Sequence, residues 1–213
     1  MTESSREARE LGELLDDLAA TWGQPLDAAA RSALIAYGLE LRRWNQRINL
    51  IRFQGWRELV YRHLIDGFAA ARYVPADAWD LIDVGAGAGI PGAVIAALRP
   101  DLSVVALEPI HKKHAFLRSL RRRMPITNFS PLASRLGEPS EESDFEGRFD
   151  VAVSRATWAP REWLERGRKL VKPSGRILAF EGVERVDLPA GAERHEYEAD
   201  GRERAIIALP GES

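Results

Sequence analysis

Beyond residue 75 the chain alternates between short apolar runs and helical stretches, and this alternation constrains the fold more than any other feature. The apolar runs predict strands at 80–84, 103–107, 127–131, 149–153, 176–180 and 204–209. Helices are expected between them at 91–98, 112–123 and 158–171. Strands that alternate with helices build a doubly wound, mainly parallel sheet with helices on both faces. We therefore predict an α/β fold.

The N-terminal third of the chain contains helical patterns only. Helices are expected there at about 7–20, 27–45 and 56–71. Their apolar stripes need a surface on which to pack, so they are not expected to fold independently. We predict a helical cap over 1–74, a ligand-binding core over 75–213, and a single domain over 1–213.

The first strand of this core runs into a glycine-rich turn. Residues 80–92 read DLIDVGAGAGIPG. Gly85, Gly87 and Gly89 allow positive φ angles and let a ligand approach the backbone closely. Ligands of doubly wound sheets bind beyond the carboxyl ends of the strands. A nucleotide-like ligand is therefore expected at this turn.

Two carboxylates narrow the class of nucleotide. Gly87, Gly89 and Gly92 also satisfy the dinucleotide fingerprint, which leaves a dehydrogenase as one alternative. Asp83, however, would repel a pyrophosphate and would pair with a cationic amino group. Glu108, after the next strand, can accept hydrogen bonds from both ribose hydroxyls. The two acids together favour S-adenosylmethionine; the structural alternative is that Asp83 caps the turn and Glu108 is a solvated strand end.

The charged residues are unevenly distributed along a chain whose net charge is -2. Residues 31–72 hold eight arginines against three acidic residues, and residues 112–123 hold six basic residues and no acidic one. Such runs form either solvated helix faces or a groove that tracks phosphates. On the second interpretation the candidate substrate contacts of the later run are Lys112, Lys113, Arg122 and Arg123.

The segment after the fourth predicted strand restricts the methyl acceptor. It contains Arg155 and Trp158 but lacks the Asn/Asp-Pro-Pro-aromatic segment that receives an exocyclic amino group. The chain has no cysteine, which a 5-methylcytosine enzyme needs for covalent attack. A ring nitrogen such as guanine N7 needs neither device. Arg155 could donate to the guanine or hold a phosphate and Trp158 could stack on a base, or the two could be a salt-bridge partner and helix core.

Taken together, these segments resemble the bacterial small-subunit ribosomal RNA guanine-N7 methyltransferases, the RsmG family. The resemblance spans about 39–209 and is carried by RWN (43–45), INL (48–50), RHLID (62–66), the turn at 83–92, KK (112–113), FL (116–117), SR (134–135), SRA (154–156) and DGRER (200–204). It implies a class I, Rossmann-like methyltransferase with a seven-stranded sheet. It also implies S-adenosyl-L-methionine as cofactor and ribosomal RNA or the small ribosomal subunit as partner.

The resemblance further implies roles for individual residues. Arg155 would be the catalytic residue and would also contact the substrate. The implied cofactor-binding residues are Asp83, Gly85, Gly87, Gly89, Glu108, Ser134 and Arg135. Two alternatives remain open, namely an enzyme of the same fold with another acceptor and a catalytically inactive protein that binds the cofactor or RNA.

One position departs from the family pattern in a way that bears on the substrate. The family tends to end its fifth strand with Ala-Leu-Lys-Gly, whereas residues 179–182 of this chain read AFEG. A carboxylate from Glu181 at the mouth of an RNA site would repel phosphate. This departure bears on the RNA substrate more than on the fold or the cofactor, and it suggests the alternative with a different acceptor.

The remaining expectations concern metals, compartment and assembly. His63 is expected to have a structural or hydrogen-bonding role, and His111 and His114 to lie on the surface, so no metal site is expected. The N-terminus is polar and no apolar run approaches the length of a membrane span. We expect a cytoplasmic monomer that does not bind membranes.

Overall fold

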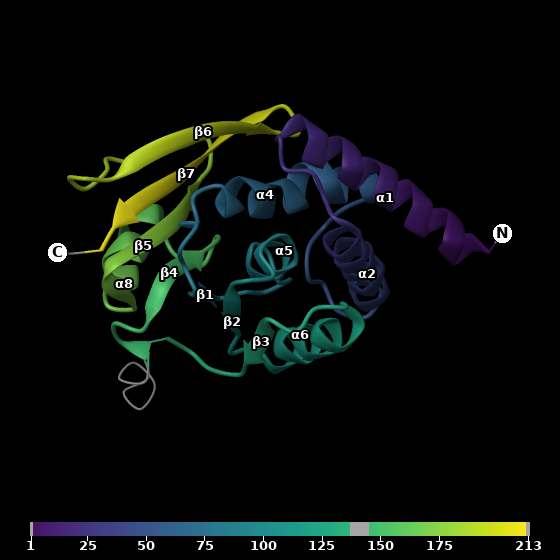
Figure 1. Ribbon diagram of the computed structural model, residues 1–213, viewed down its shortest axis with the longest axis horizontal. Coiled ribbons are helices and arrows are strands. Elements are labelled where there is room, and N and C mark those ends of the chain that lie inside the picture. Colours follow the sequence, from purple (N-terminus) through teal and green to yellow (C-terminus); the bar gives the residue numbers. More distant parts are fainter. Residues whose placement is uncertain (1, 137–144, 212–213) are drawn as a thin grey trace.

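The computed structural model describes residues 2–136 and 145–211, and in them seven strands form one sheet in the order β3-β2-β1-β4-β5-β7-β6 (Figure 1). The strands are β1 (Asp80–Val84), β2 (Ser103–Leu107), β3 (Phe129–Leu132), β4 (Phe149–Ser154), β5 (Val171–Glu181), β6 (Glu193–Ala199) and β7 (Arg202–Pro210). The first five pair in parallel, and β7 is antiparallel to both of its neighbours. The predicted mainly parallel α/β sheet is confirmed.

Helices precede the sheet and alternate with its strands. They are α1 (Glu3–Thr21), α2 (Ala28–Asn45), α3 (Trp56–Glu58), the π-helical η1 (Leu59–Leu64), α4 (Ile65–Ala71), α5 (Gly92–Leu98), α6 (His111–Arg123) and α8 (Pro160–Arg168). Side-chain caps begin the first two, because Thr2 accepts from the Ser5 N–H at 3.3 Å and Asp27 from the Ala30 N–H at 2.7 Å. No helix in this described part of the chain is long and apolar enough to cross a membrane.

The sheet separates two apolar layers because successive strand side chains point to opposite faces. In β1, Leu81 belongs to the cluster formed with α1, α2, α4, α5 and α6, whereas Ile82 belongs to the cluster that includes Trp163 of α8. Figure 1 shows α8 on the other side of the sheet from α5. The larger cluster also joins the N-terminal helices to the core, since it contains Leu34 of α2 and Val94 of α5.

A second link between the N-terminal helices and the core is polar. The Tyr37 hydroxyl of α2 donates to the Ala88 carbonyl in the glycine-rich turn at 2.7 Å. Nearby, the buried Glu40 carboxylate accepts from the Ser119 hydroxyl of α6 at 2.6 Å and from the Trp44 indole at 2.7 Å. The cap therefore holds the turn on which the ligand is expected.

The structure shifts the ends of β3 and α8 by up to three residues from the predicted ranges and differs more clearly in three other places. The strand β6 was not predicted, because it lies at the sheet edge and carries mostly polar side chains (ERHEYEA). The strand β5 begins at Val171, ahead of the predicted start, and continues past a register shift through residues 173–175, which read as a turn. The helix expected at 56–71 contains the π-helical η1.

Candidate active site

Two adjoining cavities open at the carboxyl ends of the parallel strands. The strand-end cavity, of about 380 Å³, lies beyond β1, β2, β3 and β4. The cap-side cavity, of about 600 Å³, lies between that edge, the cap helices and the β6–β7 hairpin. Residues that line both are Gly85, Lys113, Ala156 and Thr157. The two cavities therefore adjoin at these four residues.

The glycine-rich turn forms the floor between the cavities. Gly85, Gly87 and Gly89 have φ angles of 75°, 56° and 80°, in the left-handed region that disfavours side chains. At Gly85 a Cβ would also overlap the Thr157 hydroxyl. The sequence therefore needs glycine at Gly85 for two separate reasons.

Glu108 borders the strand-end cavity and organises the turn. Its Oε2 accepts from the Gly87 N–H at 2.9 Å, and its Oε1 accepts from the Ile110 N–H at 2.8 Å. The side chain is only 3% exposed, so the alternative of a solvated strand end is wrong. Each carboxylate oxygen keeps a further lone pair, which leaves room for hydrogen bonds from a ligand.

Asp83 lies beneath the turn and lines neither cavity. Its Oδ2 accepts from the Gly92 N–H at 2.8 Å, as in the turn-capping alternative. Its Oδ1 is buried without a hydrogen-bond partner in the described residues. Burial raises the pKa of this carboxyl to about 7. Pairing of Asp83 with a cationic amino group stays a prediction, and the unpartnered oxygen is the acceptor that such a group would use.

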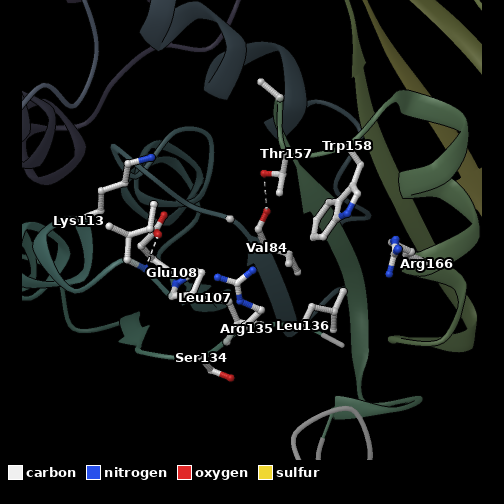
Figure 2. A pocket seen from close by; sticks show the side chains of 14 residues that line it. Val84, Leu107, Glu108, Lys113, Ser134, Arg135, Leu136, Thr157, Trp158 and Arg166 are labelled. Atoms are coloured by element: carbon white, nitrogen blue, oxygen red, sulfur yellow. Dashed lines mark hydrogen bonds between the residues drawn. The ribbon is translucent and has the colours of Figure 1, made fainter. Parts of the chain in front are cut away.

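The remaining walls of the strand-end cavity come from the segments after β3 and β4. The buried Ser134 and the exposed Arg135 both line it. Figure 2 shows Glu108 and Lys113 on one side of this cavity and Trp158 on the other. Trp158 stacks on Trp163 with ring centroids 5.5 Å apart. This contact holds Trp158 in the wall of the strand-end cavity. Trp158 does not line the cap-side cavity.

The loop after β4 is held at the junction of the cavities. The Ser154 hydroxyl donates to the Val84 carbonyl at 2.7 Å. The Thr157 hydroxyl donates to the same oxygen at 3.5 Å (Figure 2). Ala156 between them has a φ of 58°, which is unfavourable for a residue with a Cβ. Backbone strain of this kind is typical of functional sites.

A buried carboxylate organises the cap-side cavity. The Oδ2 of Asp66 accepts from Arg155 Nη1 at 2.7 Å. Its Oδ1 accepts from the Tyr197 hydroxyl at 2.7 Å and from Arg204 Nη1 at 2.6 Å. We call these four residues the Asp66 cluster. Arg155 therefore forms a salt bridge, as one of its two sequence-based interpretations expected, and it also lines the cap-side cavity.

The cap-side cavity is cationic overall. Its basic lining residues are Arg52, Arg62, Lys113, Arg155 and Arg204, and its acidic ones are Asp66 and Glu181. His63 also lines it and donates from Nε2 to the Arg52 carbonyl at 3.0 Å. Burial lowers the pKa of His63, which keeps the ring neutral at pH 7. Such a lining suits an anionic ligand.

Most of the chain matches known proteins of one kind. The model of the family described as rRNA small subunit methyltransferase G matches residues 30–206. The chain belongs to this family.

Individual relatives agree with that assignment. Ribosomal RNA small subunit methyltransferase G of Azoarcus sp. (strain BH72) is 34% identical over 184 residues, which cover 84% of each chain. Its counterpart in Anaeromyxobacter dehalogenans (strain 2CP-C) is 36% identical over 170 residues, covering 79% of this chain and 78% of the other.

Solved structures of more distant proteins share the fold. An O-methyltransferase family protein from Burkholderia thailandensis has a TM-score of 0.54 and 14% identity, and the match covers 87% of this chain and 61% of the other. A SAM dependent methyltransferase from Aquifex aeolicus has a TM-score of 0.52 and 15% identity over 71% of this chain and 92% of the other. The predicted class I methyltransferase fold is confirmed.

Within this family fold, the predicted substrate residues of α6 lie in two places. Lys113 lines both cavities, and the exposed Lys112 precedes it at the start of the helix. Arg122 and Arg123 are exposed at the opposite end, about 15 Å along the helix axis from Lys112. The structure thus brings only Lys113 to the cavities.

Glu181, which departs from the family pattern, does not present a bare charge. Its carboxylate is buried and accepts from Arg194 Nε at 2.7 Å, from Arg194 Nη2 at 3.0 Å and from the Val186 N–H at 2.8 Å. The hydrogen bonds and charge of Arg194 lower the pKa of Glu181, although burial opposes this. The repulsion of phosphate expected from the sequence is therefore largely cancelled.

Sequence reasoning assigned no role to three residues of the Asp66 cluster. Asp66 and Arg204 stand in segments that carry the family resemblance. The sequence signal that could have identified Asp66 as a functional residue is a carboxylate inside an apolar helix. Tyr197 had no signal, because β6 itself was not predicted. Over the described residues there is no group of three or more His, Asp or Glu side chains that could hold a metal ion.

Proposed function

We propose that this protein transfers the methyl group of S-adenosyl-L-methionine to N7 of a guanine in small-subunit ribosomal RNA. The observation that carries the proposal is the junction of the two cavities at Gly85, Lys113, Ala156 and Thr157. One cavity is bordered by a buried acceptor carboxylate, Glu108, and the other is cationic. Methyl transfer needs a donor and an acceptor in contact, and this arrangement provides for both.

The strand-end cavity fits the cofactor in its polar groups. Glu108 would accept hydrogen bonds from the ribose hydroxyls, and Gly85, which lines the cavity without a side chain, would leave its backbone open to the ligand. Ser134 and Arg135 would complete the wall. Asp83 lines neither cavity, so its buried carboxylate would act on the positive end of the amino-acid tail from beneath the turn, through its charge. The cofactor supplies an electrophilic methyl group on a sulfonium.

The cap-side cavity fits a guanine nucleotide of an RNA chain. Guanine N7 carries a free lone pair, so the protein needs to orient the base and does not need to remove a proton. His63 agrees with this, because its ring is neutral and its Nε2–H is already donated to Arg52. Arg155, as the catalytic residue, would hold the base through the O6 acceptor. Lys112, Lys113, Arg122 and Arg123 would contact phosphates on either side.

The proposal is tested by methyl transfer to a defined acceptor. Small ribosomal subunits isolated from a strain lacking the modification are incubated with the protein and methyl-labelled S-adenosylmethionine, and the labelled nucleoside is identified after digestion. We expect label in 7-methylguanosine. Label in another nucleoside would show a different acceptor. Absence of label, with a protein that binds S-adenosylhomocysteine in calorimetry, would favour the catalytically inactive alternative.

A further inference from the structure

The Asp66 cluster joins parts of the chain that are far apart in sequence. The partners of Asp66 are 89 residues away at Arg155, 131 at Tyr197 and 138 at Arg204. They lie after β4, on β6 and on β7 respectively, whereas Asp66 lies on α4 of the cap. One carboxylate thus sets the position of three side chains that all line the same cavity.

The hydrogen bonds of the cluster leave part of Arg155 available. Only Nη1 of Arg155 is bound, and Nε and Nη2 have no partner in the part of the chain that the structure describes. Arg204 likewise donates only from Nη1 among the described contacts, but to two acceptors, Asp66 and the Arg62 carbonyl at 2.9 Å. Arg155 also directly precedes Ala156, which lines both cavities. Arg155 therefore lines the cap-side cavity directly beside a residue of the junction.

We infer that Asp66 is a positioning residue, which fixes the Arg155 guanidinium so that its free N–H donors meet O6 of the acceptor guanine and leave N7 without a donor. This inference rests on the proposed function. Guanine carries O6 and N7 side by side as acceptors on one edge, and a guanidinium can donate to both, so the placement of Arg155 against this edge decides which acceptor it reaches. A hydrogen bond to N7 would occupy the lone pair that must attack the methyl group.

The chemistry of the step explains why a carboxylate suits this position. The N7 lone pair forms the new N–C bond, the electron pair of the broken S–C bond stays on sulfur, and no proton moves. The base becomes a cation while the sulfonium loses its charge. An arginine alone beside that base would oppose the developing charge, and the paired Asp66 carboxylate offsets this effect.

A second set of contacts holds the cluster rigid. The Tyr197 ring packs edge-on against Trp22 of α1 with centroids 5.8 Å apart. Burial, followed by the charge and hydrogen bond of Asp66, raises the pKa of Tyr197, so its hydroxyl remains a donor. The helix that presents Asp66 begins directly after the π-helical η1, and π-helical turns are frequent at functional sites.

The variant Asp66→Asn tests the inference because it replaces only one of the two carboxylate oxygens with a hydrogen-bond donor. Oδ1 faces two donors and would remain the amide oxygen, whereas the new NH2 group would face Arg155 and lose its hydrogen bond. We expect kcat for methyl transfer to fall about tenfold, with the Kd for S-adenosylhomocysteine changed less than about twofold. The matched control is Asp101→Asn, an exposed acid paired with Arg99 away from both cavities. It should change neither quantity.

A double-mutant cycle separates positioning from a general structural effect. If Asp66 acts through Arg155, then kcat of the double variant Asp66→Asn/Arg155→Met should equal that of Arg155→Met alone. If the losses in kcat of the two single variants multiply in the double variant, the inference is overturned. An unchanged kcat in Asp66→Asn would also overturn it.

A spectroscopic readout keeps the inference testable even if the wild type transfers no methyl group to ribosomal RNA. In ¹⁵N–¹H spectra of arginine side chains, the signal missing in Arg155→Met identifies Arg155. We expect that signal to move and sharpen in Asp66→Asn, because the guanidinium is released. An unchanged Arg155 signal would overturn the positioning role. Lack of methyl transfer by the wild type, with a shifted signal, would contradict the proposed function and support the positioning role.

Discussion

The Glu108 carboxylate at the end of β2 accepts the Gly87 N–H of the turn after β1 at 2.9 Å. This bond joins the two neighbouring strand ends at which the sequence places acidic residues and glycines. The buried Glu108 carboxylate accepts hydrogen bonds from the backbone N–H groups of Gly87 and Ile110, so the protein holds the shape of the turn without a ligand. The site is therefore largely formed before the ligand arrives.

Replacement of Glu108 should weaken cofactor binding and stability together. In Glu108→Gln the amide NH2 would face either the Gly87 or the Ile110 N–H, so one backbone donor loses its acceptor. We expect S-adenosylhomocysteine affinity to fall about tenfold by calorimetry. The free energy of unfolding should fall by about 1–2 kcal/mol in urea denaturation. Glu198→Gln, exposed on β6 and outside both cavities, is the control. Equal affinities of Glu108→Gln and wild type would remove Glu108 from the cofactor site.

Two glycines of the turn should respond differently to the same substitution. Gly85→Ala and Gly87→Ala both place a Cβ at positive φ, at a cost of about 1–2 kcal/mol. At Gly87 the nearest atom, the Gly85 carbonyl oxygen, is 3.7 Å from the added Cβ, whereas at Gly85 the Cβ overlaps Thr157. Urea denaturation should show the larger loss for Gly85→Ala. The double variant Gly85→Ala/Thr157→Gly should recover part of it, and no recovery would contradict the steric explanation.

The pH dependence of stability should report the burial of Asp83. Its folded pKa of about 7 lies well above the ordinary value of 3.8 for an aspartate, so the folded state binds its proton more tightly than the unfolded state. The stability that this group contributes is complete below about pH 4 and is lost as the pH rises through about 7. Asp83→Asn keeps an oxygen for the Gly92 N–H and removes the titration.

Denaturation at about pH 5.5 and about pH 8.5 measures this effect. The free energy of unfolding of Asp83→Asn, taken relative to that of wild type, should rise by on the order of a few kcal/mol between the lower and the higher pH. Asp101→Asn is the control, because Arg99 holds the pKa of Asp101 below its usual range and so outside this interval. A constant difference between Asp83→Asn and wild type would mean that Asp83 does not titrate in this range.

The two ends of α6 should be separable by salt dependence of RNA binding. We expect Lys112→Gln/Lys113→Gln and Arg122→Gln/Arg123→Gln each to weaken binding to a small-subunit RNA fragment. If both residues of a pair contact phosphates, the slope of log K against log salt should become shallower by about 1.4 in single-stranded RNA. Binding is measured by fluorescence anisotropy over a salt series. An unchanged slope for the arginine pair would confine the RNA to the half of α6 near the cavities.

Local patterns accounted for most of the fold. The period of apolar residues located β1, β2 and β4 to within a residue, because a buried parallel strand must be apolar along its length. The same reasoning missed β6, since a strand at the sheet edge needs no continuous apolar run. Glu181 shows a related limit, because its charge could be read from the chain but its pairing with Arg194 could not.

By its sequence alone the chain determined the α/β class, the glycine turn, the two strand-end acids and the family. These features depend on neighbouring residues, whose spacing sets both strand direction and backbone freedom. Tertiary structure decided that Asp83 is buried beneath the turn, that Lys113 and Arg122 lie at opposite ends of one helix, and that Asp66 holds Arg155 across 89 residues. Such contacts depend on how distant segments pack, and packing brings together side chains that carry no common local pattern.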